Sequence, residues 1–331
     1  MEEHIEKSEE VLLSVKNLTT HYVTREIGTC EAVRNVSFDI HKGETLGLVG
    51  ETGAGKTSIA LSILRLLPVP PAKIVEGEIY WGAKNLLKVH EREMRKIRGG
   101  EISMVFQDPM TALNPVDTVG DQIAEVIYLH QKVTKVESKR LAAEMLEVVG
   151  IPKERFGEYP HQFSGGMKQR VIIAMALACN PKLLIADEPT TALDVTIQAQ
   201  VLRMMNDLKS KNGTAVLLIT HDLGVIAEMC QRVAVIYSGE IVEMGTAEDL
   251  FDRTAHPYTM GLFDSLPRVS SGDRLIPIPG MMPDPSNLPK GCKFAERCKY
   301  ATDVCREQEV DLTEMEPGHY CRCIHKLTKE G

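Results

Sequence analysis

The sequence contains no long hydrophobic run and few aromatic residues. Its longest apolar stretch, Val171–Cys179, has nine residues, which is about half of what a helix needs to cross a bilayer. Any role of this sequence at a membrane is therefore expected to be peripheral. Trp occurs once and the aromatic residues make up 5% of the chain, so aliphatic side chains supply most of the 43% hydrophobic content. A length of 331 residues allows one large α/β domain with an appendage, or two medium domains.

The sequence also lacks an excess of basic residues. Its formal charge is −8 and its pI is about 5.8, which gives no reason to expect nucleic acid as a partner. Residues 1–10 are acidic and lack the apolar core of a signal peptide, so we expect a short solvated tail there. Eight cysteines without an export signal are typical of a reducing compartment, where thiols serve packing, metal binding or redox chemistry.

A complete phosphate-binding motif follows the short apolar run Thr45–Val49. The next eight residues match G-x-x-x-x-G-K-[ST], and a helical stretch, Thr57–Leu67, follows as this motif requires. Backbone N–H groups of the loop would converge on phosphate oxygens, Lys56 would place a charge near the β- and γ-phosphates, and the Thr57 hydroxyl would bind Mg²⁺. The residues predicted to bind nucleotide here are Gly50, Glu51, Thr52, Gly53, Ala54, Gly55, Lys56 and Thr57.

Two acidic residues, Asp187 and Glu188, come directly after the apolar run Lys182–Ala186. Ligands bind at the carboxyl edge of a parallel sheet, and the pair would lie at that edge. Asp187 would hold Mg²⁺ through its water shell, and Glu188 would orient and polarise the attacking water. Such a pair can also simply cap the following helix.

The coarse pattern predicts an α/β fold. Strands at Val11–Val15 and Ala32–Ile40 form an antiparallel layer, and the apolar runs Thr45–Val49, Lys182–Asp187 and Ala215–Thr220 suit a sheet covered on both faces. Helical periodicity between about 110 and 180 indicates an inserted helical subdomain. The last predicted strands are Arg232–Ser238 and Glu240–Met244, and the Pro-rich stretch Pro267–Pro289 is expected to be extended and irregular.

Several separated motifs in the right order make residues 11–250 resemble the ATP-binding cassette (ABC) ATPases. The resemblance implies a P-loop, RecA-like core in an ABC nucleotide-binding domain over residues 1–255, with the helical subdomain at about 110–180. Gln107 matches the glutamine loop, which senses Mg²⁺ and contacts the membrane partner. His221, directly after Ala215–Thr220, matches the switch histidine that bonds the γ-phosphate. Tyr22 falls where the family stacks an aromatic ring on adenine, although ordinary packing is the alternative.

The segment Phe163–Met167 matches the family's signature element. Ser164 can cap a helix that begins near Met167, while Gly165 and Gly166 leave its N-terminal N–H groups open to an anion. In the family this element closes over the ATP of the other subunit in a head-to-tail dimer, and Ala192-Leu193-Asp194 corresponds to the loop that crosses the interface. The resemblance thus adds Ser164, Gly165, Gly166 and Asp194 as residues that act in trans, beside Lys56, Glu188 and His221 as catalytic residues and Thr57, Gln107 and Asp187 as the Mg²⁺ site.

The chain after residue 255 resembles the oligopeptide and dipeptide importer branch of the family, and nickel importers share much of it. The resemblance begins at His256-Pro257-Tyr258, includes Leu266-Pro267 and ends with His319–Cys323. It implies an importer ATPase with a second ATPase subunit (a paralogue or the same chain), two membrane permease subunits and, indirectly, an extracytoplasmic solute-binding protein. Such a protein lies peripherally on the cytoplasmic face of the cell membrane.

A Cys-rich C-terminal extension, residues 256–331, would form a small separate module. Cys292, Cys298, Cys305 and either Cys321 or Cys323 could supply four thiolates to a [4Fe–4S] cluster or a tetrahedral zinc. The spacing lacks the paired C-x-x-C of zinc knuckles and so favours iron–sulfur, with zinc and metal-free thiols as alternatives. Some peptide-importer ATPases carry a cluster here, and the family position favours Cys323 as the fourth ligand. We expect Cys30, Cys179 and Cys230 to be small core residues.

Other functions fit the sequence less well. A non-transport ABC ATPase usually has two cassettes or long basic or coiled-coil insertions, and none of these occurs here. A metabolic P-loop kinase would lack Ser164–Gly166 and His221. The sequence leaves open whether the solute is a dipeptide, an oligopeptide or nickel.

Overall fold

The computed structural model describes residues 10–26, 28–108, 112–190, 193–265, 277–325 and 327. The chain divides into two compact units, each built from segments that are distant in the sequence. The first unit comprises Met1–Leu13, Asp39–Thr45 and Trp81–Ile219, and the second comprises Ser14–Phe38, Leu46–Tyr80 and Thr220–Gly331. The predicted extension therefore belongs to the same compact unit as the phosphate loop.

Three parallel strands form the centre of the first unit. They are β6 (Ile102–Val105), β7 (Leu183–Asp187) and β8 (Ala215–Thr220), with β7 between the other two. Every residue of β7 and β8 is buried, as expected for continuous apolar runs in a sheet covered on both faces.

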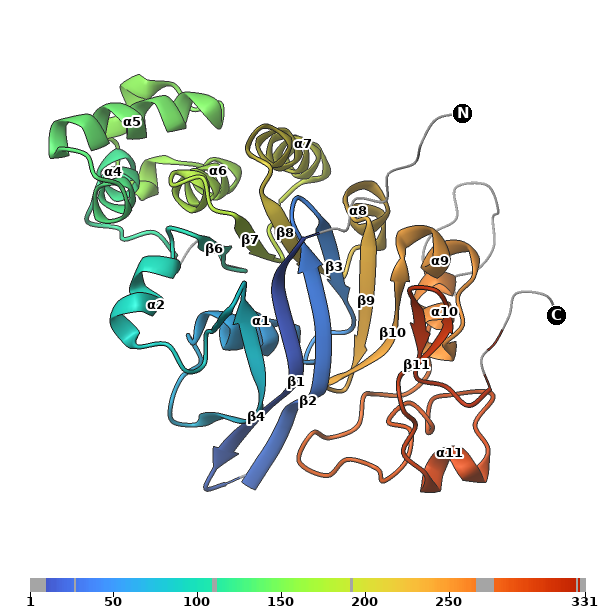
Figure 1. The fold of residues 1–331 in the computed structure, drawn as a ribbon. Helices are drawn as coiled ribbons and strands as arrows, with labels where there is room; N and C mark the ends of the chain where they lie inside the picture. Colours follow the sequence, from blue (N-terminus) through green and yellow to red (C-terminus); the bar gives the residue numbers. More distant parts are fainter. Residues whose placement is uncertain are drawn as a thin grey trace, which may run out of the picture. The chain divides into compact units, whose positions relative to one another are not determined.

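The helices of the first unit confirm the predicted helical insertion. In Figure 1, α4, α5 and α6 lie beside one another, and contacts join each of the three to the other two. The side chains of Thr118, Thr134 and Asp194 accept N–H bonds in the first turns of α4, α5 and α7. The unit's remaining elements are β5 (Lys84–Asn85), α2 (Glu91–Ile97), α4 (Val119–His130), α5 (Lys135–Val148), η1 (Lys153–Gly157), η2 (Pro160–Gln162), α6 (Gly165–Leu177) and α7 (Val195–Asn212).

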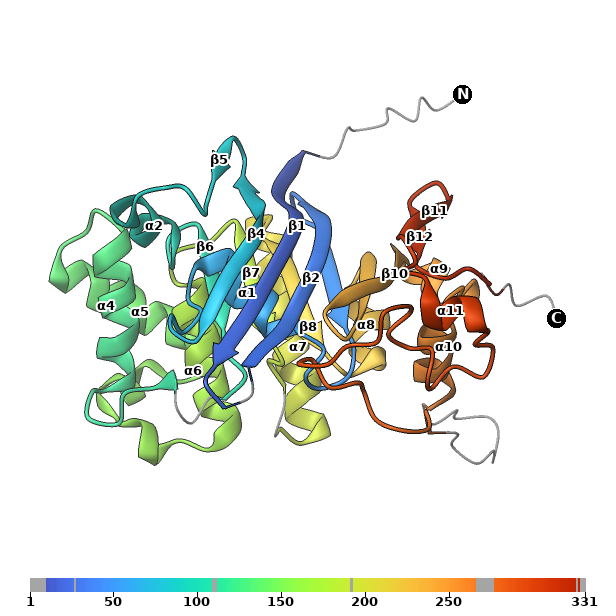
Figure 2. The same cartoon turned by 90° about the horizontal axis from the view of Figure 1, so that it is seen from below.

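In the second unit, β3 (Thr45–Val49) pairs in parallel with β9 (Arg232–Tyr237). The antiparallel partner of β9 is β10 (Glu240–Thr246), as the predicted turn at Gly239 requires. From there the ladder continues through β12 (His319–Cys321) to β11 (Thr313–Glu316). The end of the extension thus adds strands to the edge at β10, which Figure 2 shows from below.

A second layer of this unit contains β1 (Val11–Thr24), β2 (Gly28–His41) and β4 (Ala72–Trp81), with β1 in the middle. The short link between β1 and β2 makes them an antiparallel pair, as predicted. Helix α1 (Lys56–Leu64) ends earlier than the predicted Leu67, because Arg65 takes a left-handed conformation with φ of 52°. The other helices are α8 (Leu223–Met229), α9 (Ala247–Asp252), α10 (Pro257–Asp264) and α11 (Asp303–Glu307).

Residues 277–289 contain no helix or strand, in agreement with the predicted irregular stretch. Residues 267–276 of that stretch lie outside the described residues. The same holds for Leu266, at the start of the predicted Leu266-Pro267 pair, and for Ala192 of the predicted interface loop. Among the helices that the structure describes, none is both long enough and apolar enough to pass through a bilayer.

Candidate functional site

The phosphate loop lies between β3 and α1, as the motif requires. Lys56 is buried, and its Nζ donates to the carbonyl oxygens of Gly50 and Glu51 at 2.7 and 3.0 Å. The ammonium is therefore held inside the curve of the loop. Because the first N–H groups of α1 have no intrahelical acceptor, this end of the helix can bind an anion.

Two of the loop's glycines are dictated by close backbone contacts. A Cβ at Gly50 would lie 2.1 Å from the carbonyl oxygen of Ile236 in β9, and one at Gly55 would lie 2.2 Å from that of Ala32 in β2. Gly55 also has a φ of 102°, which side chains rarely allow. The glycines thus let the loop pack directly against two neighbouring strands.

Tyr22 is half-buried in β1, and its hydroxyl lies 3.1 Å from the Ser58 Oγ in α1. The sequence did not indicate this contact. It fixes the end of the Tyr22 side chain beside the helix that follows the phosphate loop.

Gln107 and Glu188 meet in the first unit. Glu188 follows β7, and its Oε2 accepts a 2.9 Å hydrogen bond from the Gln107 Nε2. The backbone N–H of Glu188 donates to the Ile219 carbonyl at 2.8 Å, and its φ is 47°. A non-glycine residue in this left-handed region is uncommon, and such strained residues cluster at functional sites. Asp187, at the end of β7, is buried.

The signature element packs against the start of α7. Ser164 caps α6 by accepting the N–H of Met167 at 3.4 Å, which is the predicted cap. A Cβ at Gly166 would lie 2.7 Å from the Ile197 Cγ2, whereas one at Gly165 would meet nothing within 4 Å. Asp194 accepts the N–H of Ile197 at 2.9 Å and so caps α7. The structure thereby brings together the two elements predicted to act in trans.

His221 is exposed in the turn between β8 and α8. The turn is fixed by Asp222, whose N–H donates to the Thr220 hydroxyl at 3.0 Å and whose carboxylate accepts the N–H of Gly224 at 2.9 Å. The sequence predicted the place of His221 at the strand end, but not the side-chain bonds that hold it there.

The four cysteines Cys292, Cys298, Cys305 and Cys323 line one small cavity in the extension. Burial, and in addition the neighbouring cysteines, raise the pKa of Cys292 to about 11, and burial also raises the pKa of Cys298. None of the four forms a disulfide bond.

Two other residues bear on the choice of the fourth predicted ligand, which is Cys321 or Cys323. Cys321 is buried in β12 opposite Glu243 of β10 and does not line the cavity. His325 does line it, and its Nε2 lies 3.5 Å from the Cys305 Sγ. The sequence signal that could have indicated this histidine is its position two residues after Cys323. Among the described residues, no three or more Cys, His, Asp or Glu side chains are arranged to hold a single metal ion.

Of the three cysteines expected in the core, Cys230 is buried, whereas Cys30 and Cys179 are only partly buried. The prediction therefore holds fully for Cys230 alone. Burial raises the pKa of the other two thiols.

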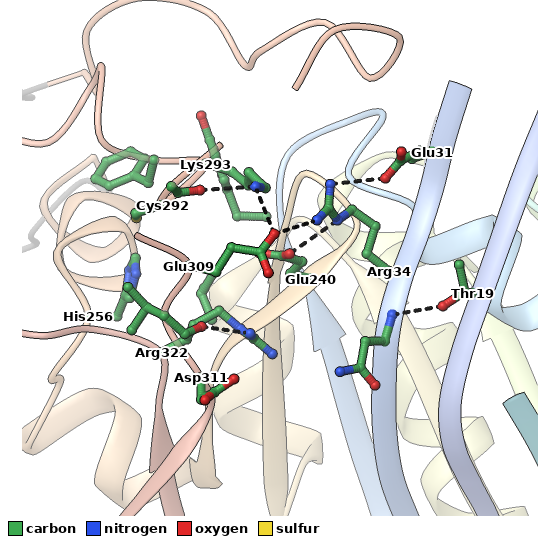
Figure 3. A pocket seen from close by; sticks show the side chains of 16 residues that line it. Thr19, Glu31, Arg34, Glu240, His256, Cys292, Lys293, Glu309, Asp311 and Arg322 are labelled. Atoms are coloured by element: carbon green, nitrogen blue, oxygen red, sulfur yellow. Dashed lines mark hydrogen bonds and ion pairs between the residues drawn. The ribbon is translucent and has the colours of Figure 1, made fainter. Parts of the chain in front are cut away.

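A second cavity, of about 220 Å³, lies beside the cysteines and is rich in charge (Figure 3). Arg34 forms ion pairs with Glu31, Glu240 and Glu309 at 2.9, 3.2 and 3.2 Å. Lys293 donates to three carbonyl oxygens, the nearest that of Pro289 at 2.7 Å. These charges are satisfied within the chain, so we interpret the cavity wall as a structural ion-pair network that ties the extension to β2 and β10.

Two known families match separate parts of the chain. The family described as ABC transporter matches residues 33–191, and the one described as oligopeptide/dipeptide transporter, C-terminal region, matches residues 242–305. The first includes the phosphate loop, the signature element and Glu188, and the second includes Cys292, Cys298 and Cys305.

Individual proteins are similar over nearly the whole chain. The probable peptide ABC transporter ATP-binding protein y4tR of Sinorhizobium fredii is 54% identical, covering 95% of each chain. The oligopeptide transport ATP-binding protein OppD of Bacillus subtilis is 51% identical over 94% of this chain and 88% of its own. Among solved structures, a dimeric ATP-binding cassette in a post-hydrolysis state, bound to ADP and Pi, aligns with a TM-score of 0.64 at 29% identity, covering 71% of this chain and 98% of that one.

Proposed function

The chain belongs to the ABC transporter family, and on that basis we propose that it is the ATP-hydrolysing subunit of an importer for dipeptides or oligopeptides. The observation that carries the proposal is the similarity along the whole chain, including the extension, to peptide-transport ATP-binding proteins. Neither a nickel importer nor a non-transport ATPase is favoured by a comparable observation.

In the proposed site, Lys56 and the loop N–H groups bind the triphosphate, and Tyr22 stacks on the adenine. Bound Mg²⁺ would neutralise charge on the β- and γ-phosphates, and Thr57, Gln107 and Asp187 offer the oxygen ligands that this hard cation prefers. Glu188 accepts a proton from, and orients, the attacking water, and His221 bonds the γ-phosphate. The Gln107–Glu188 hydrogen bond supports this assignment because it fixes the carboxylate that receives the proton.

Replacing Glu188 by Gln tests the catalytic assignment. Gln keeps an oxygen that can accept the Gln107 bond but cannot take the proton, so we expect ATP turnover to fall by about 10²–10⁴-fold while ATP binding is retained. Glu147→Gln is the matched control, because the exposed Glu147 carboxylate forms an ion pair with Lys153 in the first unit and no hydrogen bond or ion pair joins it to Glu188 among the residues that the structure describes. Turnover at the parent rate in the Glu188→Gln protein would overturn the role of Glu188.

We further propose that ATP is bound between two head-to-tail subunits, with Ser164, Gly165, Gly166 and Asp194 reaching the partner's nucleotide. The dimeric cassette among the similar structures supports this arrangement. The second subunit is a paralogue or another copy of this chain, the permease pair anchors both, and the assembly lies on the cytoplasmic face of the membrane. Co-purification from membranes with the two permeases identifies the partners, and isolation without any membrane subunit would contradict an importer.

Transport assays separate the possible solutes. Reconstituted with its permeases and a solute-binding protein, the ATPase is expected to be stimulated when that protein carries a di- or oligopeptide. Stimulation by Ni²⁺ alone would replace the peptide proposal with the nickel one.

For the extension, we propose a [4Fe–4S] cluster held by Cys292, Cys298, Cys305 and Cys323. Their shared cavity supports it, since each thiolate of such a cluster binds a different iron and the four need not converge on one ion. A cluster bound there would crosslink the four cysteines and so stabilise the extension. The expected observation is broad absorption at about 400 nm, with iron and sulfide in the purified protein.

Cys323→Ser and Cys321→Ser form a matched pair for this proposal. The first should lose the absorption and the second should keep it, because Cys321 does not line the cavity. Colourless protein with stoichiometric zinc would establish the zinc alternative, and colourless protein without metal would leave plain thiols.

A further inference from the structure

The C-terminal extension holds the phosphate loop directly. Arg297 lies 246 residues after Glu51, yet its Nη1 is 3.0 Å from both carboxylate oxygens of Glu51. The backbone N–H of Glu51 donates to the hydroxyl of Tyr258 at 3.0 Å. Both contacts lie within the second compact unit. One residue of the loop is therefore fixed by its side chain and its backbone to two residues of the extension.

Other contacts hold the Arg297 side chain in the position that binds Glu51. Its side chain is 6% exposed, its Nε donates to the Pro279 carbonyl at 2.8 Å, and its Nη1 also reaches the Tyr237 hydroxyl at 3.3 Å. The guanidinium lies over the ring of Phe294, 5.9 Å from its centroid. Such a fixed fork loses little entropy when it binds a carboxylate.

Tyr258 is equally constrained. It is completely buried, and its ring packs against Tyr237 and Phe294 with centroid distances of 4.6 and 5.4 Å. Burial, together with the nearby Glu51 carboxylate, raises its pKa, so the phenol keeps its proton. A neutral hydroxyl can then accept the N–H of Glu51 throughout the neutral pH range.

Glu51 passes these constraints on to the phosphate-binding lysine. Its carbonyl oxygen accepts the Lys56 Nζ at 3.0 Å and the N–H of Ala54 at 3.2 Å. A change in the backbone conformation of Glu51 would therefore move the Lys56 ammonium, which is proposed to contact phosphate. Arg297 also neutralises a carboxylate that would otherwise repel the triphosphate.

We propose that Arg297 and Tyr258 are positioning residues for the phosphate loop, through which the extension sets the affinity of the subunit for ATP. The proposal rests on the loop binding nucleotide, as in the proposed function. It requires neither a particular transported solute nor a cluster in the cysteine cavity.

The test measures the equilibrium dissociation constant for ATP, together with KM and kcat, in the full-length protein with its partner subunits. Arg297→Gln is expected to raise Kd and KM for ATP by about tenfold with a smaller change in kcat. Without its ion pair, Glu51 repels the triphosphate and holds Lys56 less firmly, which weakens the binding of ATP before hydrolysis. Arg297→Lys, which keeps the charge, should recover part of the affinity. Tyr258→Phe, which removes only the hydroxyl, should raise KM by a few-fold.

A double-variant cycle distinguishes positioning from general support of the extension. Once Glu51→Gln has removed the carboxylate, Arg297→Gln should change Kd by less than about threefold. Arg322→Gln is the matched control. Arg322 lines the charged cavity (Figure 3) and donates to the carbonyls of Ile241 and Val310, and among the described residues it has no hydrogen bond or ion pair with the loop. This substitution should lower the melting temperature and leave Kd unchanged.

The outcomes separate the two proposals. A parent protein that does not bind ATP would overturn the proposed function itself. If the parent binds ATP but Arg297→Gln leaves Kd unchanged, or Arg322→Gln raises it equally, or the cycle is additive, the positioning role is wrong. Should Arg297→Gln fail to fold, Tyr258→Phe decides the question, and an unchanged Kd in that variant refutes the proposal.

Discussion

Replacing Gly166 by Ala should destabilise the protein, whereas the same change at Gly165 should not. Both glycines belong to the signature element and to the first turn of α6. Only the Cβ at Gly166 would collide with the chain, 2.7 Å from the Ile197 Cγ2 in α7. The two substitutions therefore separate packing inside the subunit from any contact that the element makes with a partner.

The magnitude follows from the overlap. Carbon atoms prefer separations of about 3.5–4.0 Å, so this contact is about 1 Å too short, and a β-branched side chain in a helix has little rotamer freedom to move away. Overpacking of this kind typically costs about 1–3 kcal/mol, and the better helix propensity of Ala returns at most about 1 kcal/mol. We expect Gly166→Ala to lower the free energy of unfolding by about 1–2 kcal/mol and Gly165→Ala to leave it equal or slightly higher.

Urea unfolding of the parent and both variants measures these differences. Adding Ile197→Ala should suppress the penalty at Gly166, since the Ile197 Cβ would remain 3.7 Å from the new methyl group, an ordinary contact. ATPase assays then show whether Gly165→Ala, with an intact fold, still loses activity, as a contact in trans requires. Equal stability of the two single variants, or no recovery with Ile197→Ala, would refute the packing argument.

Three further predictions concern the second unit. His319→Gln removes the imidazole that lies 2.9 Å from the buried Glu243 carboxylate, which keeps the N–H bonds of Ala255 and His256, and should cost about 1–3 kcal/mol in urea unfolding. The bond to Glu243 raises the pKa of His319. The protonated histidine therefore stabilises the fold fully below the ordinary histidine pKa of about 6.5, and this stabilisation is lost as the pH rises through the higher pKa of the folded state. If the unfolding free energies of parent and variant differ by the same amount at every pH, this linkage is wrong. Burial lowers the pKa of His256 to about 4, so between about pH 6.5 and 4 the unfolded chain binds a proton that the folded chain does not. The free energy of unfolding should therefore fall by about 3 kcal/mol as the pH is lowered through this range, and a His256→Gln variant should not show this fall. Gly50→Ala, with its Cβ 2.1 Å from the Ile236 carbonyl oxygen, should abolish ATP binding in equilibrium titrations, and near-parent affinity would contradict the close approach.

Local chemistry explains the parts of the fold that could be predicted. The strands at Thr45–Val49 and Ala215–Thr220 have the predicted bounds, because a short apolar run between polar turns has few alternatives to a buried strand. The cap at Ser164 was likewise predictable, since a side-chain oxygen three residues before an N–H acts locally. The predicted end of α1 was wrong because the left-handed Arg65 that ends the helix carries no glycine signal.

The sequence by itself determined the family, the phosphate loop and the order of the motifs, because each separate motif consists of residues that are close together in the chain. Tertiary structure alone decided that Gly166 packs on Ile197 and that Arg297 reaches Glu51. Each of these contacts joins segments whose separation in space is set by the packing of whole strands and helices. No local pattern of residues records that packing, so these contacts could not be predicted from the sequence.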